Sequence, residues 1–358
     1  MASGIVISAK GGTGKTTFAI NLAKALADAT EQRGLRQKQG VLYLDLDICD
    51  PNGALRLDQV GAASFYELFK SYETGARRGD LKSLCQVLKN DNFSILGCEV
   101  LGARQREELS QLFTLQTYAS LFFRDLERLI SQYDHCIIDT PGGGLVSFLP
   151  LLLGSDFVYN VFDLRDETSI RSSEKVLIDF FYFCHKYRSI KNTGTKMIQV
   201  LFSFYDDGKL KKYRNAITQR LEDWLVWNLE EGDRSPIDPW IPENFEWWRA
   251  QHHKRRRHSV RTFIETYLSE RLRFLEGLPK SDKIERANDR GRLYIGSRFE
   301  NLFRDGVRNI MNASELFLRE AEFLEGWRQR GALAEISDFL TARVSPSPRP
   351  RKGAAVTT

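Results

Sequence analysis

Short apolar runs alternate with longer amphipathic stretches over about the first 205 residues of the chain. The apolar runs have the length of buried strands and lie at residues 4–8, 41–46, 93–97, 133–139, 156–162 and 196–204. Between them, apolar side chains recur at spacings of three and four residues, which is typical of helices that pack one face against a core. This alternation predicts a doubly wound α/β domain, with a mostly parallel sheet and helices on both of its faces.

The pattern changes after residue 205, where the chain becomes charged and helical. Amphipathic sequence with helical spacing lies at 210–229, 259–278 and 310–340. All six tryptophans lie in this region, where helical spacing favours roles in packing. The tail is rich in proline and basic residues, which predicts disorder. The predicted parts are an α/β domain over 1–205, a mainly α-helical extension over 206–340 and a disordered basic, Pro-rich tail over 341–358.

The composition is that of an ordinary globular protein, with 42% apolar and 28% charged residues and a formal net charge of +5. No apolar run is long enough to cross a bilayer, so no membrane span is expected. The chain passes from Met1 directly into a strand pattern without the features of a signal peptide, so the expected location is the cytoplasm. The five cysteines form no Cys-x-x-Cys pair, which indicates buried thiols and argues against a cysteine-bound cluster.

The first candidate site is the segment Lys10-Gly-Gly-Thr-Gly-Lys-Thr-Thr17, between the first strand pattern and a stretch rich in helix formers. Its glycines allow the backbone to curl around a polyphosphate, and the N–H groups of the following helix match the negative charge. Lys15 would bring a positive charge to the β- and γ-phosphates, and Thr16 would ligate Mg²⁺. The residues expected to surround the nucleotide are Gly11, Gly12, Thr13, Gly14, Lys15, Thr16 and Thr17. The sequence thus predicts a phosphate-binding loop.

Three aspartates follow predicted strands at the same edge of the sheet. Asp45 and Asp47 end the second strand pattern, and Asp139 ends a later one, directly before Thr140-Pro-Gly142. The carboxyl ends of parallel strands share one edge with the phosphate-binding loop. We therefore expect the three carboxylates to face the phosphates and a metal ion.

The motif Lys-Gly-Gly-x-Gly-Lys-Thr-Thr begins with a lysine, Lys10, at the position where the usual phosphate-binding loop has a glycine. It resembles the deviant Walker A motif of the ParA/MinD family of dimerising ATPases. The resemblance covers about residues 1–205, because the Asp-x-Asp strand and the Asp-Thr-Pro-Gly strand follow in the order of that family. It implies a P-loop NTPase fold and an ATP-dependent homodimer, whose slow ATP hydrolysis is stimulated by an activating partner protein.

The resemblance also implies a role for each charged residue of the site. Lys10 would reach across the dimer interface to the partner's nucleotide and act in catalysis there. Asp47 would orient or deprotonate the attacking water, and Asp45 would support the metal shell. Asp139 would hold Mg²⁺ through a water molecule, and the glycines at 142–144 would let the next segment move with the state of the γ-phosphate. ATP and Mg²⁺ are the expected cofactors.

No base-reading residue is evident in the sequence. Members of the family commonly carry an asparagine after the late strand, and the stretch 201–207 offers none at the expected place. No Asn-Lys-x-Asp sequence is present to support guanine recognition. ATP is therefore expected from the resemblance alone.

A basic run follows Trp247 and Trp248 in the helical region. Its central cations are Lys254, Arg255, Arg256 and Arg257. Such a run can contact DNA phosphates while tryptophans add stacking, although charge runs are often only a solvated helix face. ParA-like proteins bind DNA without sequence specificity, so the run is a candidate DNA-binding segment. The nucleoid is accordingly a candidate location. The Pro-rich tail lacks the amphipathic basic helix with which MinD-like proteins bind membranes.

Three functions are compatible with these patterns. By the resemblance, the protein is an ATP-dependent dimerising switch that positions or segregates DNA or a protein cargo. Alternatively, the helical region is an adaptor or effector regulator whose contact with a protein is gated by ATP, without DNA positioning. A third interpretation is an ATP-driven chaperone like the arsenite-pump and tail-anchored-protein ATPases, although no client groove is recognisable in the sequence.

Overall fold

The protein is described from a computed structural model. It describes residues 2–32, 39–47, 53, 65–75, 81, 86–87, 93–97, 101–114, 116–143, 148–165, 167–186, 197–205, 207–230, 265, 268, 272–275 and 278–279. The basic run at 254–257 and the predicted tail at 341–358 lie outside these residues. Most of the predicted helical extension beyond residue 230 also lies outside them.

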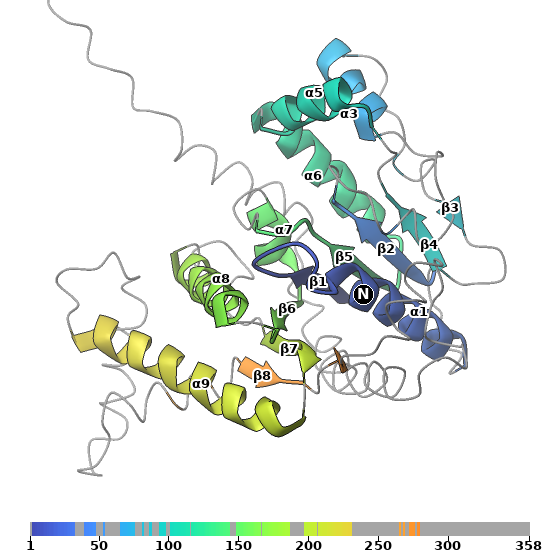
Figure 1. The fold of residues 1–358 in the computed structure, drawn as a ribbon. Helices are drawn as coiled ribbons and strands as arrows, with labels where there is room; N and C mark the ends of the chain where they lie inside the picture. The colour runs from blue at the N-terminus through green and yellow to red at the C-terminus, as the bar shows by residue number, and fades with distance from the viewer. Residues whose placement is uncertain are drawn as a thin grey trace, which may run out of the picture.

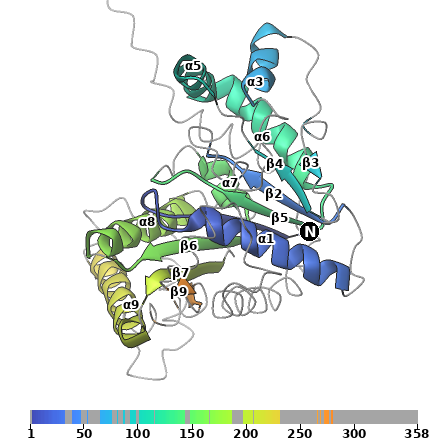
Figure 2. The same ribbon diagram turned by 45° about the vertical axis from the view of Figure 1, so that its right-hand side comes forward.

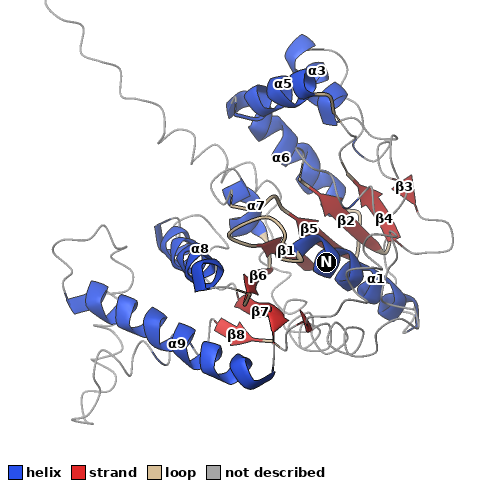
Figure 3. Ribbon diagram, in the orientation of Figure 1, coloured by secondary structure: helices blue, strands red, loops and turns tan. Residues whose placement is uncertain are grey.

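The described strands form one nine-stranded sheet, which Figures 1 and 3 show at the centre of the molecule. The strands are β1 (Ala2–Ile7), β2 (Val41–Asp45), β3 (Gln86–Val87), β4 (Phe93–Leu96), β5 (His135–Asp139), β6 (Phe157–Asp163), β7 (Met197–Tyr205), β8 (Leu272–Phe274) and β9 (Leu278–Pro279). Their order is β3-β4-β2-β5-β1-β6-β7-β8, and β9 also pairs with β7. Only the β3–β4 pair is antiparallel. The predicted doubly wound, mostly parallel sheet is confirmed.

The described helices follow the predicted alternation with the strands. They are α1 (Lys15–Gln32), α3 (Phe65–Thr74), α5 (Ala103–Thr114), α6 (Gln116–Ile130), α7 (Leu149–Gly154), α8 (Glu167–Lys186) and α9 (Asp207–Glu230). Two helices lie between the predicted strand runs at 93–97 and 133–139, since α5 ends at Thr114 and α6 begins at Gln116. Figures 1 and 2 show α3, α5 and α6 at the opposite end of the sheet from α8 and α9.

Apolar side chains cover both faces of the sheet, which explains why the strands read as continuous apolar runs. Along β1, Ile5 and Ile7 join a cluster with residues of α3, α6, α7, α8 and α9. Val6 points to the other face and joins a cluster with Phe18 and Leu22 of α1. Because both faces are filled, the polar chemistry is confined to the ends of the strands.

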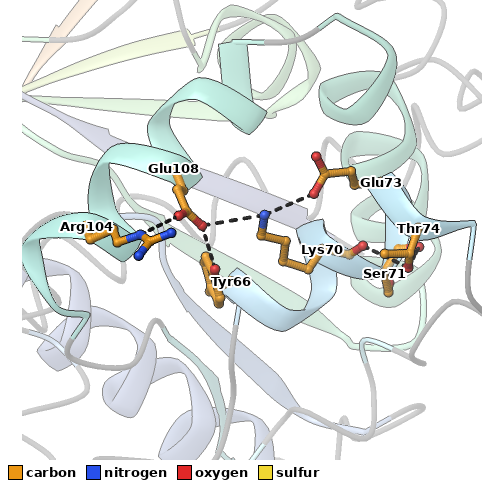
Figure 4. Close-up of polar contacts among 7 residues, drawn as sticks. All are labelled: Tyr66, Lys70, Ser71, Glu73, Thr74, Arg104 and Glu108. Atoms are coloured by element: carbon orange, nitrogen blue, oxygen red, sulfur yellow. Dashed lines mark hydrogen bonds and ion pairs between the residues drawn. The ribbon is translucent and has the colours of Figure 1, made fainter.

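A polar network joins α3 to α5 at the surface of the helical layer (Figure 4). The Tyr66 hydroxyl donates to Glu108 Oε2 over 2.6 Å, and Arg104 Nε donates to Glu108 Oε1 over 3.0 Å. Lys70 Nζ lies 3.5 Å from Glu108 Oε2 and 3.0 Å from Glu73 Oε2. Solvent-screened ion pairs of this kind contribute little to stability, so the apolar contacts beneath them hold the layer together.

Part of the region beyond residue 205 continues the sheet. β8 and β9 both pair in parallel with β7, which corrects the helical prediction for residues 272–274. Arg214 of α9 donates from Nη2 to the Phe274 carbonyl over 3.1 Å, and its guanidinium lies 5.4 Å from the Phe274 ring centre. On the other side of α9, Arg220 Nε donates to Glu174 of α8 over 2.8 Å. These contacts attach α9 and β8 to the α/β domain.

Candidate functional site

The carboxyl ends of four neighbouring strands bring the predicted site residues to one edge of the sheet. In the strand register, Val6 of β1 and Asp45 of β2 both lie opposite Asp139 of β5. Ile7 of β1 lies opposite Asn160 of β6. The loop that begins at Ser8 is therefore flanked on one side by the aspartates and on the other by the end of β6, which is the usual ligand edge of a doubly wound sheet.

The loop from Ser8 to Gly14 has the curled backbone that the sequence predicts. Gly12 and Gly14 have φ angles of 71° and 88°, in the region that favours glycine. The Thr13 hydroxyl donates to Ser8 Oγ over 3.1 Å, and the Ser8 hydroxyl donates to the Lys10 carbonyl over 2.8 Å. The Phe18 N–H donates to the Gly14 carbonyl over 2.9 Å as α1 begins. The loop therefore holds its shape through its own hydrogen bonds, with the N-terminus of α1 behind it.

The Asp-Thr-Pro-Gly segment after β5 packs directly on this loop. A Cβ at Gly142 would lie 2.5 Å from the Lys10 carbonyl carbon and 2.6 Å from the Gly11 nitrogen. Gly143 has a φ angle of 82°, and its N–H donates to the Ser8 carbonyl over 3.1 Å. Glycine is thus required here for close backbone approach, a reason that the sequence analysis did not include. The predicted movement of 142–144 remains a prediction, and Gly144 lies outside the described residues.

Asp139 is fully buried, and one of its oxygens fits a magnesium site. Its Oδ2 accepts a hydrogen bond from the Tyr43 hydroxyl over 3.1 Å. Its Oδ1 is buried and has no hydrogen-bond partner among the described residues. Burial raises the pKa of Asp139, while the nearby Lys15 ammonium and the Thr16 and Tyr43 hydroxyls lower it. A buried carboxylate oxygen without a partner, near a threonine hydroxyl, suits a water molecule of a hydrated Mg²⁺ ion.

The protein supplies few direct ligands for such an ion. Within the described part of the chain, no group of three or more His, Cys, Asp and Glu side chains could hold a metal. This agrees with the usual coordination of Mg²⁺, which keeps several water ligands and binds to one or two protein groups and to the phosphates of the bound nucleotide. The structure thus fits the predicted pair, Thr16 and Asp139, and their roles toward the metal remain predictions.

Asp45 lies beside Asp139, and backbone N–H groups engage both of its oxygens. Its Oδ1 accepts the Asp47 N–H over 3.0 Å, and its Oδ2 accepts the Gly53 N–H over 2.9 Å. Burial raises the pKa of Asp45 well above its ordinary value, and the neighbouring Asp139 carboxylate adds to this effect. Asp45 therefore fixes the backbone that carries Asp47, and any contribution to the metal shell would be indirect.

Asp47 is partly exposed and lies at the open end of this cluster. Its charge raises the pKa values of both Asp45 and Asp139, which places the three carboxylates within electrostatic reach of each other. Lys15 is buried at the start of α1, and Lys10 is partly exposed at the outer edge of the loop. The structure therefore gathers the predicted residues of the nucleotide site in one place. The candidate DNA-binding residues, 254–257, lie outside the described residues.

The sequence analysis missed an arginine that contacts the phosphate-binding loop. Arg165, just after β6, donates from Nη2 to the Gly12 carbonyl over 2.8 Å. The same guanidinium donates to both carboxylate oxygens of Asp163, from Nε over 3.0 Å to Oδ1 and to Oδ2, and from Nη2 over 2.7 Å to Oδ2. Asp163 is fully buried, so it fixes the arginine in place. The available signal was an aspartate at the end of a buried strand followed two positions later by an arginine.

We expect Arg165→Ala to weaken nucleotide binding about 10-fold, because the loop loses a charge-assisted hydrogen bond that holds its curled shape. Titration of a fluorescent ATP analogue would measure the change. Arg104→Ala provides the control, since Arg104 is an exposed arginine on α5 that pairs with Glu108. Equal affinities for Arg165→Ala and the control would show that the contact with Gly12 does not matter for binding.

Comparison with known proteins gives one family match. Residues 3–160 match the sequence model of a family described as AAA domain. No curated protein matches the chain. The matched residues run from β1 into β6 and so include the phosphate-binding loop, Asp45, Asp47 and Asp139.

Several solved structures share the fold. The cell division ATPase MinD of Pyrococcus furiosus has a TM-score of 0.53 at 18% identity, over 88% of this chain and 100% of that one. A putative plasmid partition protein of Borrelia burgdorferi, bound to AMPPNP, has a TM-score of 0.52 at 16% identity, over 89% and 99%. The septum site-determining protein MinD of Pyrococcus horikoshii, complexed with Mg-ADP, has a TM-score of 0.53 at 16% identity, over 87% and 95%. At these identities the similarity establishes the fold.

None of the helices in the described part of the chain is long and apolar enough to cross a membrane.

Proposed function

We propose that the α/β part of this chain is a P-loop ATPase domain of the ParA/MinD-like type and that it works as an ATP-dependent dimerising switch. The observation that carries the proposal is the preformed loop at Lys10–Thr17 with Asp47 and Asp139 beside it. In this proposal the dimer forms with ATP and separates after hydrolysis. The functional result is then the oligomeric state of the protein, and the amount of ADP and phosphate that it produces is secondary.

The proposed hydrolysis depends on positioning and on electrostatics. The backbone N–H groups of the loop and the N-terminus of α1 would hold the phosphates, and Lys15 would add its charge at the β- and γ-phosphates. When bound, Mg²⁺ would neutralise charge that develops on the phosphates. Thr16 and Asp139 would hold that ion, the aspartate through water. Asp47 would orient the attacking water, since it is the partly exposed carboxylate of the cluster.

Lys10 would supply the link to a second subunit. It lies at the outer edge of the loop, where Gly11 and Gly12 are also exposed. A lysine placed there can reach a phosphate of a facing molecule and stabilise charge in the transition state, as an arginine finger does. Hydrolysis would then require a dimer, which explains how a partner protein that acts on the dimer could control the rate.

We expect Lys10→Ala to bind ATP but to lose most of its ATP-dependent dimer and to hydrolyse ATP at least 10-fold more slowly, because the charge across the interface is missing. Light scattering after size exclusion, together with a phosphate-release assay, would measure both effects. Lys211→Ala, which removes an exposed lysine of α9, is the control. An unchanged dimer with ATP would argue against a role of Lys10 across the interface.

The switch is proposed to position a cargo. The similar solved structures include a cell division ATPase, a septum site-determining protein and a putative plasmid partition protein. Their likeness to this chain supports a positioning function of the same general kind, with DNA or a protein assembly as cargo. An activating partner and a surface such as the nucleoid would complete the cycle. Binding of DNA by residues 254–257 remains a prediction from the basic sequence.

A further inference from the structure

We propose that Tyr43 is a positioning residue for the magnesium-binding carboxylate. Its hydroxyl would fix Asp139 Oδ2 and so leave Oδ1 as the oxygen that accepts a proton from metal-bound water. This inference rests on the proposed function, because it concerns the same nucleotide site. The family motifs in the sequence do not include this tyrosine.

The contact joins two neighbouring strands at the end of the sheet. Tyr43 lies on β2 opposite Ile137 of β5, two positions before the residue that lies opposite Asp139. Its side chain therefore shares a face of the sheet with Asp45 and reaches forward to the neighbouring strand. The hydroxyl donates to Asp139 Oδ2 over 3.1 Å in a buried environment.

Packing holds the tyrosine ring in the orientation that this contact needs. Tyr43 is fully buried, and its ring lies 6.3 Å from that of Phe93 between centroids. Gly53 closes the space above the hydroxyl, because a Cβ at that position would collide with Tyr43 Oη and would lie 2.6 Å from Asp45 Oδ2. A hydroxyl fixed in this way has little freedom to turn from Asp139 to another acceptor.

The neighbouring side chain, Asp45, cannot replace the Tyr43 hydroxyl as a hydrogen-bond donor to Asp139. Asp45 is a carboxylate, and its two oxygens already accept the backbone N–H groups of Asp47 and Gly53. The like charge of Asp139 also raises the pKa of Asp45. The Tyr43 hydroxyl on Oδ2 thus orients Asp139 and leaves Oδ1 as its buried oxygen without a hydrogen-bond partner among the described residues. Partners of this kind behind a metal-holding group commonly change metal affinity by 10- to 100-fold.

The test is the Mg²⁺ dependence of nucleotide binding by Tyr43→Phe, which removes the hydroxyl and keeps the ring. A fluorescent ATP analogue is titrated without metal and at a series of Mg²⁺ concentrations. We expect the half-saturating Mg²⁺ concentration to rise about 10-fold, with the metal-free affinity within about twofold of the wild type. Binding of Mn²⁺ to the protein in the presence of ADP, measured by electron paramagnetic resonance, should weaken to the same extent.

Tyr66→Phe is a matched control, since it also removes a tyrosine hydroxyl that donates to a carboxylate, here Glu108 over 2.6 Å, away from the site (Figure 4). An unchanged Mg²⁺ dependence in Tyr43→Phe would overturn the inference. Equal losses with and without metal would also overturn it, since they indicate a general structural role. If wild-type nucleotide binding shows no Mg²⁺ dependence at all, the proposed function itself fails, which distinguishes the two failures.

Discussion

Replacement of Lys15 by alanine is expected to abolish nucleotide binding, with a loss of affinity of more than about 100-fold. The side chain is buried at the first position of α1, directly after the curled loop. Each hydrogen bond between charged groups contributes about 1.5–3 kcal/mol, and a lysine that contacts both the β- and γ-phosphates makes more than one. Every 1.4 kcal/mol lost weakens binding tenfold.

Isothermal titration with ATP and Mg²⁺ would measure this loss. Lys24→Ala is the matched control, because Lys24 lies in the same helix and its ammonium pairs with Asp28 over 2.9 Å, away from the loop. The control should keep the affinity of the wild type. Tight ATP binding by Lys15→Ala would mean that Lys10–Thr17 is not the phosphate-binding loop.

Replacement of Asp47 by alanine is expected to separate binding from hydrolysis. The variant should bind ATP normally and hydrolyse it at least about 100-fold more slowly, because loss of a base or water-orienting group typically lowers the rate by this amount. Since ATP then persists in the site, the variant should accumulate as the dimer. Asp47 is suited to this role, since Asp45 holds its backbone N–H over 3.0 Å. The charge of Asp47 also raises the pKa of Asp139, which indicates that the two carboxylates lie near each other.

Single-turnover hydrolysis and sedimentation velocity with ATP would test this separation. Asp223→Ala removes an exposed carboxylate of α9 and should leave both measurements unchanged. If Asp47→Ala hydrolyses ATP at the rate of the wild type, another residue must orient the attacking water.

Much of the fold was predictable because its signals are local. The strands β1, β5, β6 and β7 lie within two residues of the predicted runs at either end, since a parallel strand buried on both faces must be apolar throughout. The loop at Lys10–Thr17 was equally clear, because phosphate binding demands glycine, lysine and threonine at fixed positions. The edge strand β8 was mistaken for helix, because three residues beside a helical pattern carry too little periodicity to identify a strand.

The missed parts of the site depend on contacts between distant segments. Tyr43 reads as one more apolar residue of β2, and only the pairing of β2 with β5 brings its hydroxyl to Asp139. Arg165 reads as a loop cation, and only the position of β6 beside β1 brings it to Gly12. The close packing of Gly142 on Lys10 likewise follows from the adjacent strand ends. The sequence identified the residues that are predicted to contact a phosphate, and the fold revealed the residues that hold them in place.

The central claim is that ATP controls the association of two copies of this chain. The most direct test is the molar mass of the wild-type protein in solution, measured by light scattering with Mg²⁺ and ATP, with Mg²⁺ and ADP, and without nucleotide. We expect twice the chain mass of 41.2 kDa with ATP, and the mass of a single chain in the other two conditions. The same mass in all three conditions would contradict it.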